Sequence, residues 1–168
     1  MDVLQRLRPV DDRYATRPIG EAFNWAEASR ELGEGEWYLV AFRSIRKDGA
    51  DEARLERYDE LAHLEAEGAP GFVHYFKGPR AADGSCLSFC LWTSRAEARA
   101  AAGRPAHVEA VALIEEMYAV YSLEFHRVGR DAGGELTFAP YDRPAMDAYP
   151  SVVEPPAPHV VLRPAAAS

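Results

Sequence analysis

The sequence has little of several features that mark well-known classes of protein. It contains only two cysteines in 168 residues, which excludes a small fold held together by disulfides. Its 27 aspartates and glutamates outnumber its 19 lysines and arginines, and the net charge of −8 repels phosphate backbones and anionic membrane surfaces. We therefore expect neither nucleic acid nor a membrane as a partner.

Long apolar runs are also missing. The longest, such as residues 37–42 and 110–114, are far shorter than the ~20 residues that cross a bilayer, and residues 1–6 lack the apolar core of a signal peptide. These absences predict a cytoplasmic protein. The sequence also has no zinc-ligand spacing, phosphate-binding glycine loop or nucleophile elbow, so it indicates no metal and no cofactor.

The two cysteines, Cys86 and Cys90, lie in one expected strand. Four residues along an extended strand separate them by about 13 Å, beyond the ~7 Å between Cα atoms that a disulfide spans. We expect both thiols to be buried, reduced and chemically inert.

What the sequence does contain is a succession of strand, helix, strand, strand, helix and strand between Glu36 and Arg130. The expected strands are 36–46, 72–77, 86–92 and 121–128, and the expected helices are 51–67 and, interrupted at 103–105, 94–119. The first strand is almost continuously apolar, as in a sheet covered on both faces. Ser94 and Glu97 form a capping box at the start of the second helical region. This order predicts an α+β protein with a ferredoxin-like βαββαβ fold.

Segments outside this core define the expected domain organisation. Residues 1–35 are predicted to form a surface arm and a short helix over 20–32 that closes one edge of the domain, which itself spans 36–130. Residues 131–168 are predicted to form an edge strand and an extended tail, because seven of the twelve prolines fall in the last 29 residues. Within this tail, 159–162 is apolar enough to lie along a partner or a sheet edge.

The element order, the run Trp92-Thr93-Ser94-Arg95-Ala96-Glu97-Ala98 and the downstream Pro105-Ala106-His107 resemble the antibiotic-biosynthesis monooxygenase-like family of the dimeric α+β barrel superfamily. The resemblance covers about residues 36–130. It implies a sheet whose open face packs against the same face of a second subunit, and a small-molecule cavity between each sheet and its helices. The apolar strands lead to the same homodimer, because an exposed apolar sheet face promotes aggregation.

The superfamily includes cofactor-free oxygenases of aromatic polyketides, haem-degrading enzymes and members without a known reaction. The haem-degrading members use an Asn on the first strand and a Trp within the second helix, and this sequence has neither at those places. The resemblance therefore implies first a cofactor-independent oxygenase acting on an aromatic or apolar substrate. The alternatives are a non-catalytic ligand-binding or assembly protein and, as the least favoured, a haem binder.

Two histidines are the candidate catalytic residues. His107, at the start of a helix, is either a cavity-lining acid or base or a partly exposed residue that bonds a loop carbonyl. His74, in the middle of an aromatic strand, is either catalytic or a core histidine bonded to a side chain such as Ser88 or Glu124. The aromatic side chains expected to form a substrate pocket are Phe42, Phe72, Phe89, Trp92 and Tyr118.

Two further groups of polar residues have ordinary explanations. Glu124 and His126 share a face of the last strand, where Arg43 of the first strand meets them if these strands pair. Such a cluster orients a substrate, or it is a solvated rim or a dimer salt bridge. Glu60 and His63 have the i, i+3 spacing of carboxylate metal sites, but a single pair is usually a solvated helix face.

Overall fold

The computed structural model describes residues 4–141 and the backbone of residues 160–162. Its strands are β1 (Gly35–Arg46), β2 (Phe72–Phe76), β3 (Ser85–Trp92), β4 (Tyr118–Arg130), β5 (Leu136–Pro140) and β6 (Val160–Leu162). They form one antiparallel sheet with the order β2-β3-β1-β4-β5, in which β6 also pairs with β4. The order β2-β3-β1-β4 is that of a ferredoxin-like βαββαβ fold, so the predicted α+β class is confirmed.

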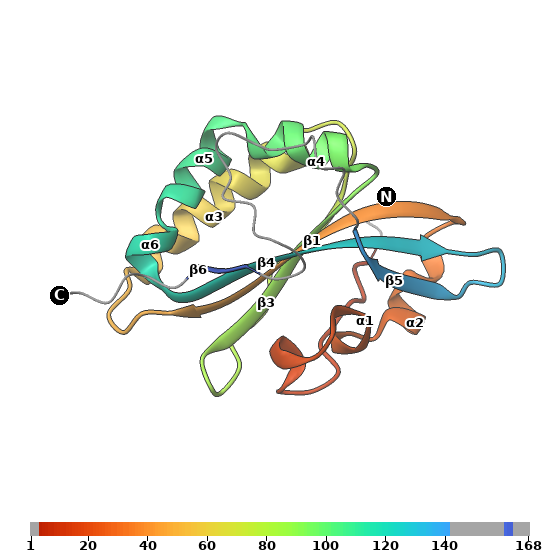
Figure 1. Ribbon diagram of the computed structural model, residues 1–168, viewed down its shortest axis with the longest axis horizontal. Coiled ribbons are helices and arrows are strands. Elements are labelled where there is room, and N and C mark those ends of the chain that lie inside the picture. The colour runs from red at the N-terminus through yellow and green to blue at the C-terminus, as the bar shows by residue number, and fades with distance from the viewer. Residues whose placement is uncertain (1–3, 142–159, 163–168) are drawn as a thin grey trace.

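Four helices form a layer on one face of the sheet (Figure 1). They are α3 (Glu52–Glu67), α4 (Arg95–Ala102), α5 (Pro105–Ala112) and α6 (Ile114–Met117). Ser94 is the N-cap of α4, as predicted, because its hydroxyl accepts a hydrogen bond from the backbone N–H of Glu97 at 3.3 Å. A new helix begins at Pro105, as the break in the pattern predicts. No helix within the described residues has both the length and the apolarity to cross a membrane.

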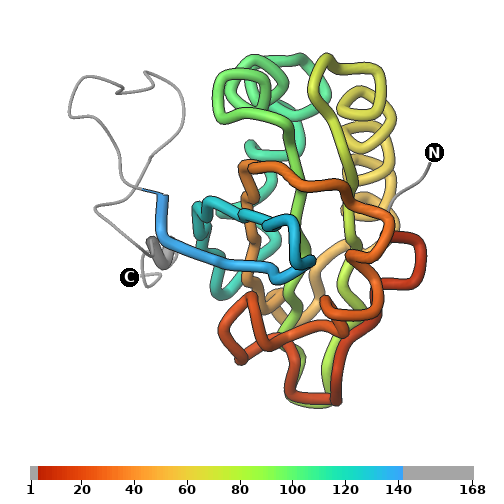
Figure 2. The backbone as a smooth tube through the Cα atoms, turned by 90° about the vertical axis from the view of Figure 1, so that its right-hand side faces the viewer, coloured from red at the N-terminus to blue at the C-terminus, as the bar shows by residue number. Residues whose placement is uncertain are grey.

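Residues 4–34 cover the opposite face of the sheet. Their short helices are η1 (Tyr14–Thr16), α1 (Ile19–Ala22), α2 (Trp25–Ala28) and η2 (Ser29–Glu31). Figures 1 and 2 both show this segment on the side away from α3–α6. The sheet residues beneath it are at most 1% exposed: Leu39, Ala41, Leu87, Phe89, Leu91 and Val128. Residues 4–34 therefore supply ten of the sixteen buried residues of the main hydrophobic core.

Aromatic rings lock this segment onto the sheet. The ring of Phe23 lies 4.8 Å from that of Phe76 and 5.5 Å from that of Phe89, both in edge-to-face orientation. Trp25 lies 5.4 Å from Phe89 and 5.1 Å from Phe138, and its indole N–H donates to the carbonyl of Ile19 at 2.7 Å. Such pairs stabilise a fold beyond the burial of their area.

The predicted helix over 20–32 is two four-residue helices with a break between them. Phe23 has an extended backbone (φ −132°, ψ 163°), which turns its side chain into the core. The side chain of Asn24 accepts the N–H of Arg8 at 2.7 Å and donates to the carbonyl of Arg6 at 3.1 Å. These bonds replace helical ones, so that residues 6–8 lie along this segment.

This cover corrects the prediction that the described part of residues 1–18 is a surface arm. It also removes the reason for expecting a second copy on the sheet, because the chain buries that face itself. The helical pattern over 20–32 predicts Phe23, Ala26 and Leu32 on the inward side; Phe23 and Leu32 are buried, whereas Ala26 is exposed. The other buried residues of this segment follow neither a helical nor a strand period. A homodimer remains a prediction, without support from an uncovered sheet face.

Two segments lie end to end along the outer edge of β4. Strand β5 pairs with residues 126–130, and β6 pairs with Tyr121–Leu123. The predicted edge strand after the Gly133-Gly134 turn is therefore present, and residues 160–162 lie along a sheet edge. The rest of the predicted extended tail, 142–159 and 163–168, lies outside the described residues.

We expect Phe23→Ala to reduce the free energy of unfolding by about 3–5 kcal/mol, because it opens a cavity among packed aromatic rings. Urea denaturation measures this change. Val10→Ala in the same segment is the control, since Val10 is 48% exposed and its truncation is expected to change stability by less than about 0.5 kcal/mol. Equal stabilities of the two variants would show that residues 4–34 are not part of the core.

Candidate functional site

A cavity of about 550 Å³ lies between the sheet and the helical layer. This is within the range of small-molecule sites, about 300–1,000 Å³. The aromatic residues that β1, β3 and β4 contribute to its wall are Tyr38, Phe42, Trp92, Tyr118, Tyr121 and Phe125. Residues of α3 and α5 form the opposite wall. The cavity is therefore mainly apolar and aromatic on its sheet side.

The period of the strands and the small helix residues explain why this space exists. Along β1, Tyr38, Val40 and Phe42 face the cavity, whereas Leu39 and Ala41 face residues 4–34. The helices present alanines to the sheet, among them Ala62 and Ala66 of α3 and Ala110 of α5. Methyl side chains are too short to fill the space opposite the rings, so a cavity remains.

The structure divides the five residues predicted for a substrate pocket. Phe42, Trp92 and Tyr118 line the cavity. Phe72 packs against Trp92, with ring centroids 5.5 Å apart, but does not line it. Phe89 belongs on the other face, where Phe23 covers it, because the strand period places Cys90 and Trp92 toward the cavity and Phe89 and Leu91 away from it. Its assignment to the pocket is wrong.

His107 lines the cavity from the first turn of α5. Burial lowers the pKa of its imidazole, and the nearby carboxylate of Glu65 offsets part of this effect. The carboxylate also accepts the backbone N–H groups of Ala106 at 3.0 Å and of His107 at 3.3 Å, which fixes the start of α5 to α3. The imidazole is therefore a neutral base at pH 7, held on an anchored helix.

His74 lies on the opposite face from His107. It pairs with Leu91, and its ring lies 6.2 Å from that of Phe89 in the main core. A register shift between Phe72 and His74 turns Phe72 toward the cavity side and His74 away from it. Of its two predicted partners, Ser88 faces the cavity, and Glu124 is separated from β2 by two strands. His74 therefore does not lie in the cavity, and the two histidines cannot belong to one site.

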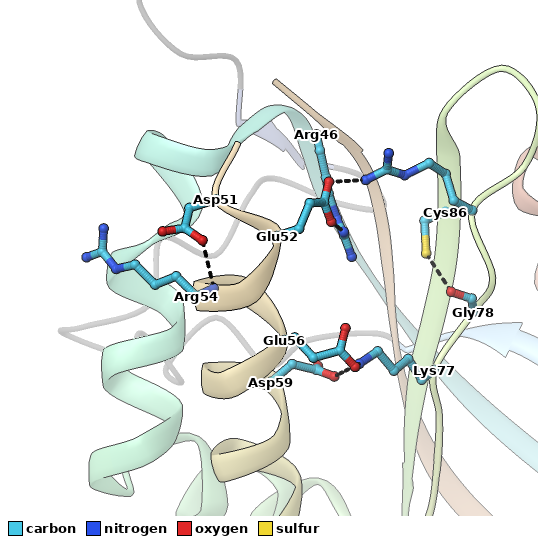
Figure 3. A network of polar contacts seen from close by, with 10 residues as sticks. Arg46, Asp51, Glu52, Arg54, Glu56, Asp59, Lys77, Gly78 and Cys86 are labelled. Carbon is cyan, nitrogen blue, oxygen red and sulfur yellow. Dashed lines mark hydrogen bonds and ion pairs between the residues drawn. The ribbon is translucent and has the colours of Figure 1, made fainter. Parts of the chain in front are cut away.

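A polar group at one end of the cavity was not predicted from the sequence. The hydroxyl of Tyr75 donates to Asp59 Oδ1 at 2.6 Å, and Lys77 Nζ lies 3.0 Å from Asp59 Oδ2 and 2.8 Å from Glu56 Oε1 (Figure 3). Burial and the neighbouring Asp59 raise the pKa of the Tyr75 phenol well above its ordinary value, so it remains protonated. The imidazole of His63 packs on Tyr75, with ring centroids 4.8 Å apart.

The position of Asp59 in the sequence indicates this group, but the residues around it on α3 suggest an apolar face. Asp59 follows Leu55 by four residues and precedes Ala62 by three, so it lies on the inward face of the helix. The spacing of Leu55, Tyr58, Leu61, Ala62 and Glu65 predicts one inward stripe on this helix, but Leu61 is 41% exposed. His63, which was assigned to a solvated face with Glu60, lines the cavity. A carboxylate on the inward face of an amphipathic helix is the sequence feature that indicates such a polar group.

The predicted meeting of Arg43, Glu124 and His126 is confirmed, but on the face away from the cavity. Arg43 forms an ion pair with Glu124 and donates to the backbone carbonyls of Ala15 at 2.6 Å and Arg17 at 2.8 Å. His126 Nε2 lies 3.1 Å from Glu124 Oε2. Glu124 is only 3% exposed, so the cluster is no solvated rim. It holds residues 15–17 against the sheet.

The charge state of Glu124 follows from these contacts. Burial by itself raises the pKa of this carboxyl, but the hydrogen bonds from His126 and Arg43 and the charge of Arg43 outweigh burial and lower the pKa to about 2. Glu124 is therefore ionised throughout the physiological range.

Cys86 and Cys90 both line the cavity and form no disulfide. Burial raises the pKa of the Cys90 thiol to about 12, so it stays protonated. Within residues 4–141, no group of three or more His, Cys, Asp or Glu side chains is arranged to hold a metal ion. The polar chemistry of the cavity therefore rests on His107 and on the group around Asp59.

Comparison with known proteins places the chain in a family. The family model described as PB2B2.08-like matches residues 1–139. The chain belongs to the PB2B2.08-like family. The match includes the segment that covers the second sheet face as well as the strands and helices, so the cover belongs to the family's shared unit. No curated protein matches the sequence.

Several solved structures are similar to this PB2B2.08-like protein. SnoaB, a cofactor-independent oxygenase from Streptomyces nogalater, is 18% identical over 55% of this chain and 90% of its own, with a TM-score of 0.42. Rv0793 from Mycobacterium tuberculosis is 18% identical over 64% and 97%, with a TM-score of 0.47. NE2512 from Nitrosomonas europaea, a protein of unknown function, is 16% identical over 67% and 99%, with a TM-score of 0.44. The fold assignment itself rests on the strand order.

We expect Glu124→Gln to lower the free energy of unfolding by about 3 kcal/mol at pH 7, because it leaves Arg43 buried without its counter-ion. The carboxyl titrates near 4.5 in the unfolded chain and near 2 in the folded one, so its contribution is complete above pH 4.5 and disappears as the pH falls to 2. Urea denaturation at pH 7, 4 and 3 should show the difference from wild type shrinking. A difference that is constant with pH, or one shared by Glu31→Gln on the surface, would contradict this account.

The imidazole of His107 should titrate below its ordinary pKa of 6.5 in the folded protein, because burial disfavours its charged form. The chemical shift of its Hε1 proton, assigned by its loss in His107→Gln, measures the midpoint. The same proton in urea-unfolded protein is the control and should titrate near 6.5. If the titration midpoint of His107 in the folded protein is at or above that in the unfolded protein, His107 is not held as a neutral base.

Proposed function

We propose that this PB2B2.08-like protein binds a small, largely apolar molecule in the cavity between the sheet and α3–α6, and oxygenates it without a bound cofactor. The observation that carries the proposal is an aromatic cavity of about 550 Å³ with the half-buried imidazole of His107 in its wall. The oxygenase class follows from the resemblance of Trp92–Ala98 and Pro105–His107 to the antibiotic-biosynthesis monooxygenase-like family.

The lining of the cavity suits a flat ligand. Tyr38, Phe42 and Phe125 offer ring faces and edges from neighbouring strands, and Tyr38 and Phe125 are stacked on each other at an interplanar angle of 11°. Apolar contacts of this kind bury most of a ligand's surface, while a few polar groups orient it. Phe42, Trp92 and Tyr118 remain the proposed contact residues among those predicted from the sequence.

His107 has the properties that a base needs. Its neutral ring accepts a proton from an acidic C–H or O–H group of the ligand, which leaves a ligand anion rich in electrons. That anion transfers an electron to O₂, and the resulting pair of radicals forms a C–O bond. His107 returns its proton to the peroxide formed in this way. Loss of a second proton from the same carbon then breaks the O–O bond and leaves a C=O group and water, so two C–H bonds of the ligand supply the four electrons that reduce O₂.

The described residues that line the cavity come from β1–β4 and α3–α6 or the turns between them, so a single chain supplies these walls. We propose that the activity does not require the homodimer predicted from the sequence. Light scattering tests for that homodimer, and association would have to use a surface other than the sheet face that residues 4–34 occupy. A ligand that binds without consumption of O₂ would instead support the non-catalytic alternative.

The location of the ligand is tested by filling the cavity. Ala62→Phe places a ring in the cavity from α3, and we expect it to weaken binding of indole at least tenfold by calorimetry. Ala53→Phe makes the same change on the exposed side of the same helix and should leave binding intact. Thermal unfolding confirms that both variants fold. Equal binding of indole by the two variants would place the ligand elsewhere.

A further inference from the structure

The cavity is lined by more carboxylates than cations. Its charged residues are Glu56, Asp59, Glu65 and Glu115 against Arg46, Lys77 and Arg99. Two of these charged side chains are already bound to other groups of the protein and are therefore less available to a ligand. Arg46 pairs with Glu52, which does not line the cavity, and Glu65 receives backbone N–H groups of α5. At the end formed by Glu56 and Asp59, the two carboxylates share one cation, Lys77, so these three side chains carry a net charge of −1.

This end already binds an ammonium group, that of Lys77. The ammonium lies between Glu56 Oε1 at 2.8 Å and Asp59 Oδ2 at 3.0 Å, and it bridges α3 to the residue that follows β2 (Figure 3). The Lys77 side chain is 44% exposed, so little is lost when it moves into water. The geometry thus shows a place for an ammonium whose present occupant is replaceable.

Asp59 is the fixed half of this place. The hydroxyl of the half-buried Tyr75 donates to Asp59 Oδ1 at 2.6 Å and sets the orientation of the carboxylate. A carboxylate oxygen accepts about two hydrogen bonds, so Oδ2 can take a second donor besides Lys77. Glu56, by contrast, is 67% exposed and has no such anchor.

We infer that the cavity selects a ligand that carries a protonated amine beside its apolar body, and that Asp59 is the residue that recognises the amine. This inference rests on the proposed function, since it concerns the ligand of the same cavity. An anionic ligand meets two carboxylates against one ammonium at this end, and a neutral ligand forgoes a charge-assisted hydrogen bond.

Three probes with one aromatic body separate the possibilities. Tryptamine carries an ammonium on a two-carbon arm, indole-3-propionate carries a carboxylate on the same arm, and 3-methylindole is neutral. Calorimetry at pH 7 and low salt should find tryptamine binding about tenfold more tightly than 3-methylindole, with indole-3-propionate the weakest. Equal binding of tryptamine and 3-methylindole would overturn the inference and leave the proposed function standing. Failure of all three to bind would count against both.

Variants of the polar group give opposite expected changes. Asp59→Asn should remove the preference for tryptamine over 3-methylindole. Lys77→Met vacates the ammonium place and should increase the affinity for tryptamine about tenfold while leaving 3-methylindole unchanged. Because these changes have opposite signs, a general loss of structure cannot produce both.

Glu60→Gln is the matched control, since it removes one negative charge from the adjacent, exposed position of the same helix. It should leave the preference for tryptamine intact. If it reduces the preference as much as Asp59→Asn does, the selectivity comes from the general field of the acidic protein, and Asp59 is not the recognition residue.

Discussion

The ion pair between Arg43 and Glu124 connects the two central strands of the sheet with the segment that covers it, and the rest of the structure depends on this connection. It crosses from β1 to β4 at the centre of the sheet, and the same guanidinium binds the carbonyls of Ala15 and Arg17 in the covering segment. A buried pair of charges is tolerated only when further hydrogen bonds satisfy both groups. Here the covering segment supplies the acceptors for the guanidinium, and His126 supplies a partner for the carboxylate. The sheet therefore needs the segment to satisfy its charges as much as to bury its apolar side chains.

The cover on one face leaves the other face free for a cavity. Alternate residues of β1 and β3 carry the two roles, since Leu39 and Phe89 pack under residues 4–34 while Tyr38 and Cys90 face the helices. The tightly packed face stabilises the sheet. The space between the sheet and the helices is incompletely filled, partly because the helices present alanines to it. The stability supplied by the packed face offsets the cost of this cavity, so the cavity can hold a ligand.

Sequence patterns predicted the regular core because its determinants are local. Local signals mark where its elements begin and end, such as the N-cap at Ser94, the helix start at Pro105 and the apolar run of β1. The succession of these elements along the chain then predicts the ferredoxin-like strand order. The covering segment was not predicted, since most of its buried residues follow no period and find their partners only in three dimensions. Within the site, His107 was found because a histidine stands out in a sequence. Asp59 was missed because its meaning depends on Tyr75 and Lys77, which reach it from β2 and the residue that follows it.

Covering the sheet with its own chain has a physical consequence that a second subunit cannot provide. A segment joined to β1 is always present at high effective concentration, so the apolar face stays buried however dilute the protein is. A face covered by a separate copy is buried only to the extent that two chains associate, and its stability then depends on protein concentration. The PB2B2.08-like match begins at residue 1 and so includes this segment. A face-to-face dimer of this chain would have to displace the rings of Phe23 and Trp25 from the sheet and leave the guanidinium of Arg43 without its two carbonyl acceptors. Those losses would make such a dimer costly, because burial of the apolar face and the partners of Arg43 both come from the same chain.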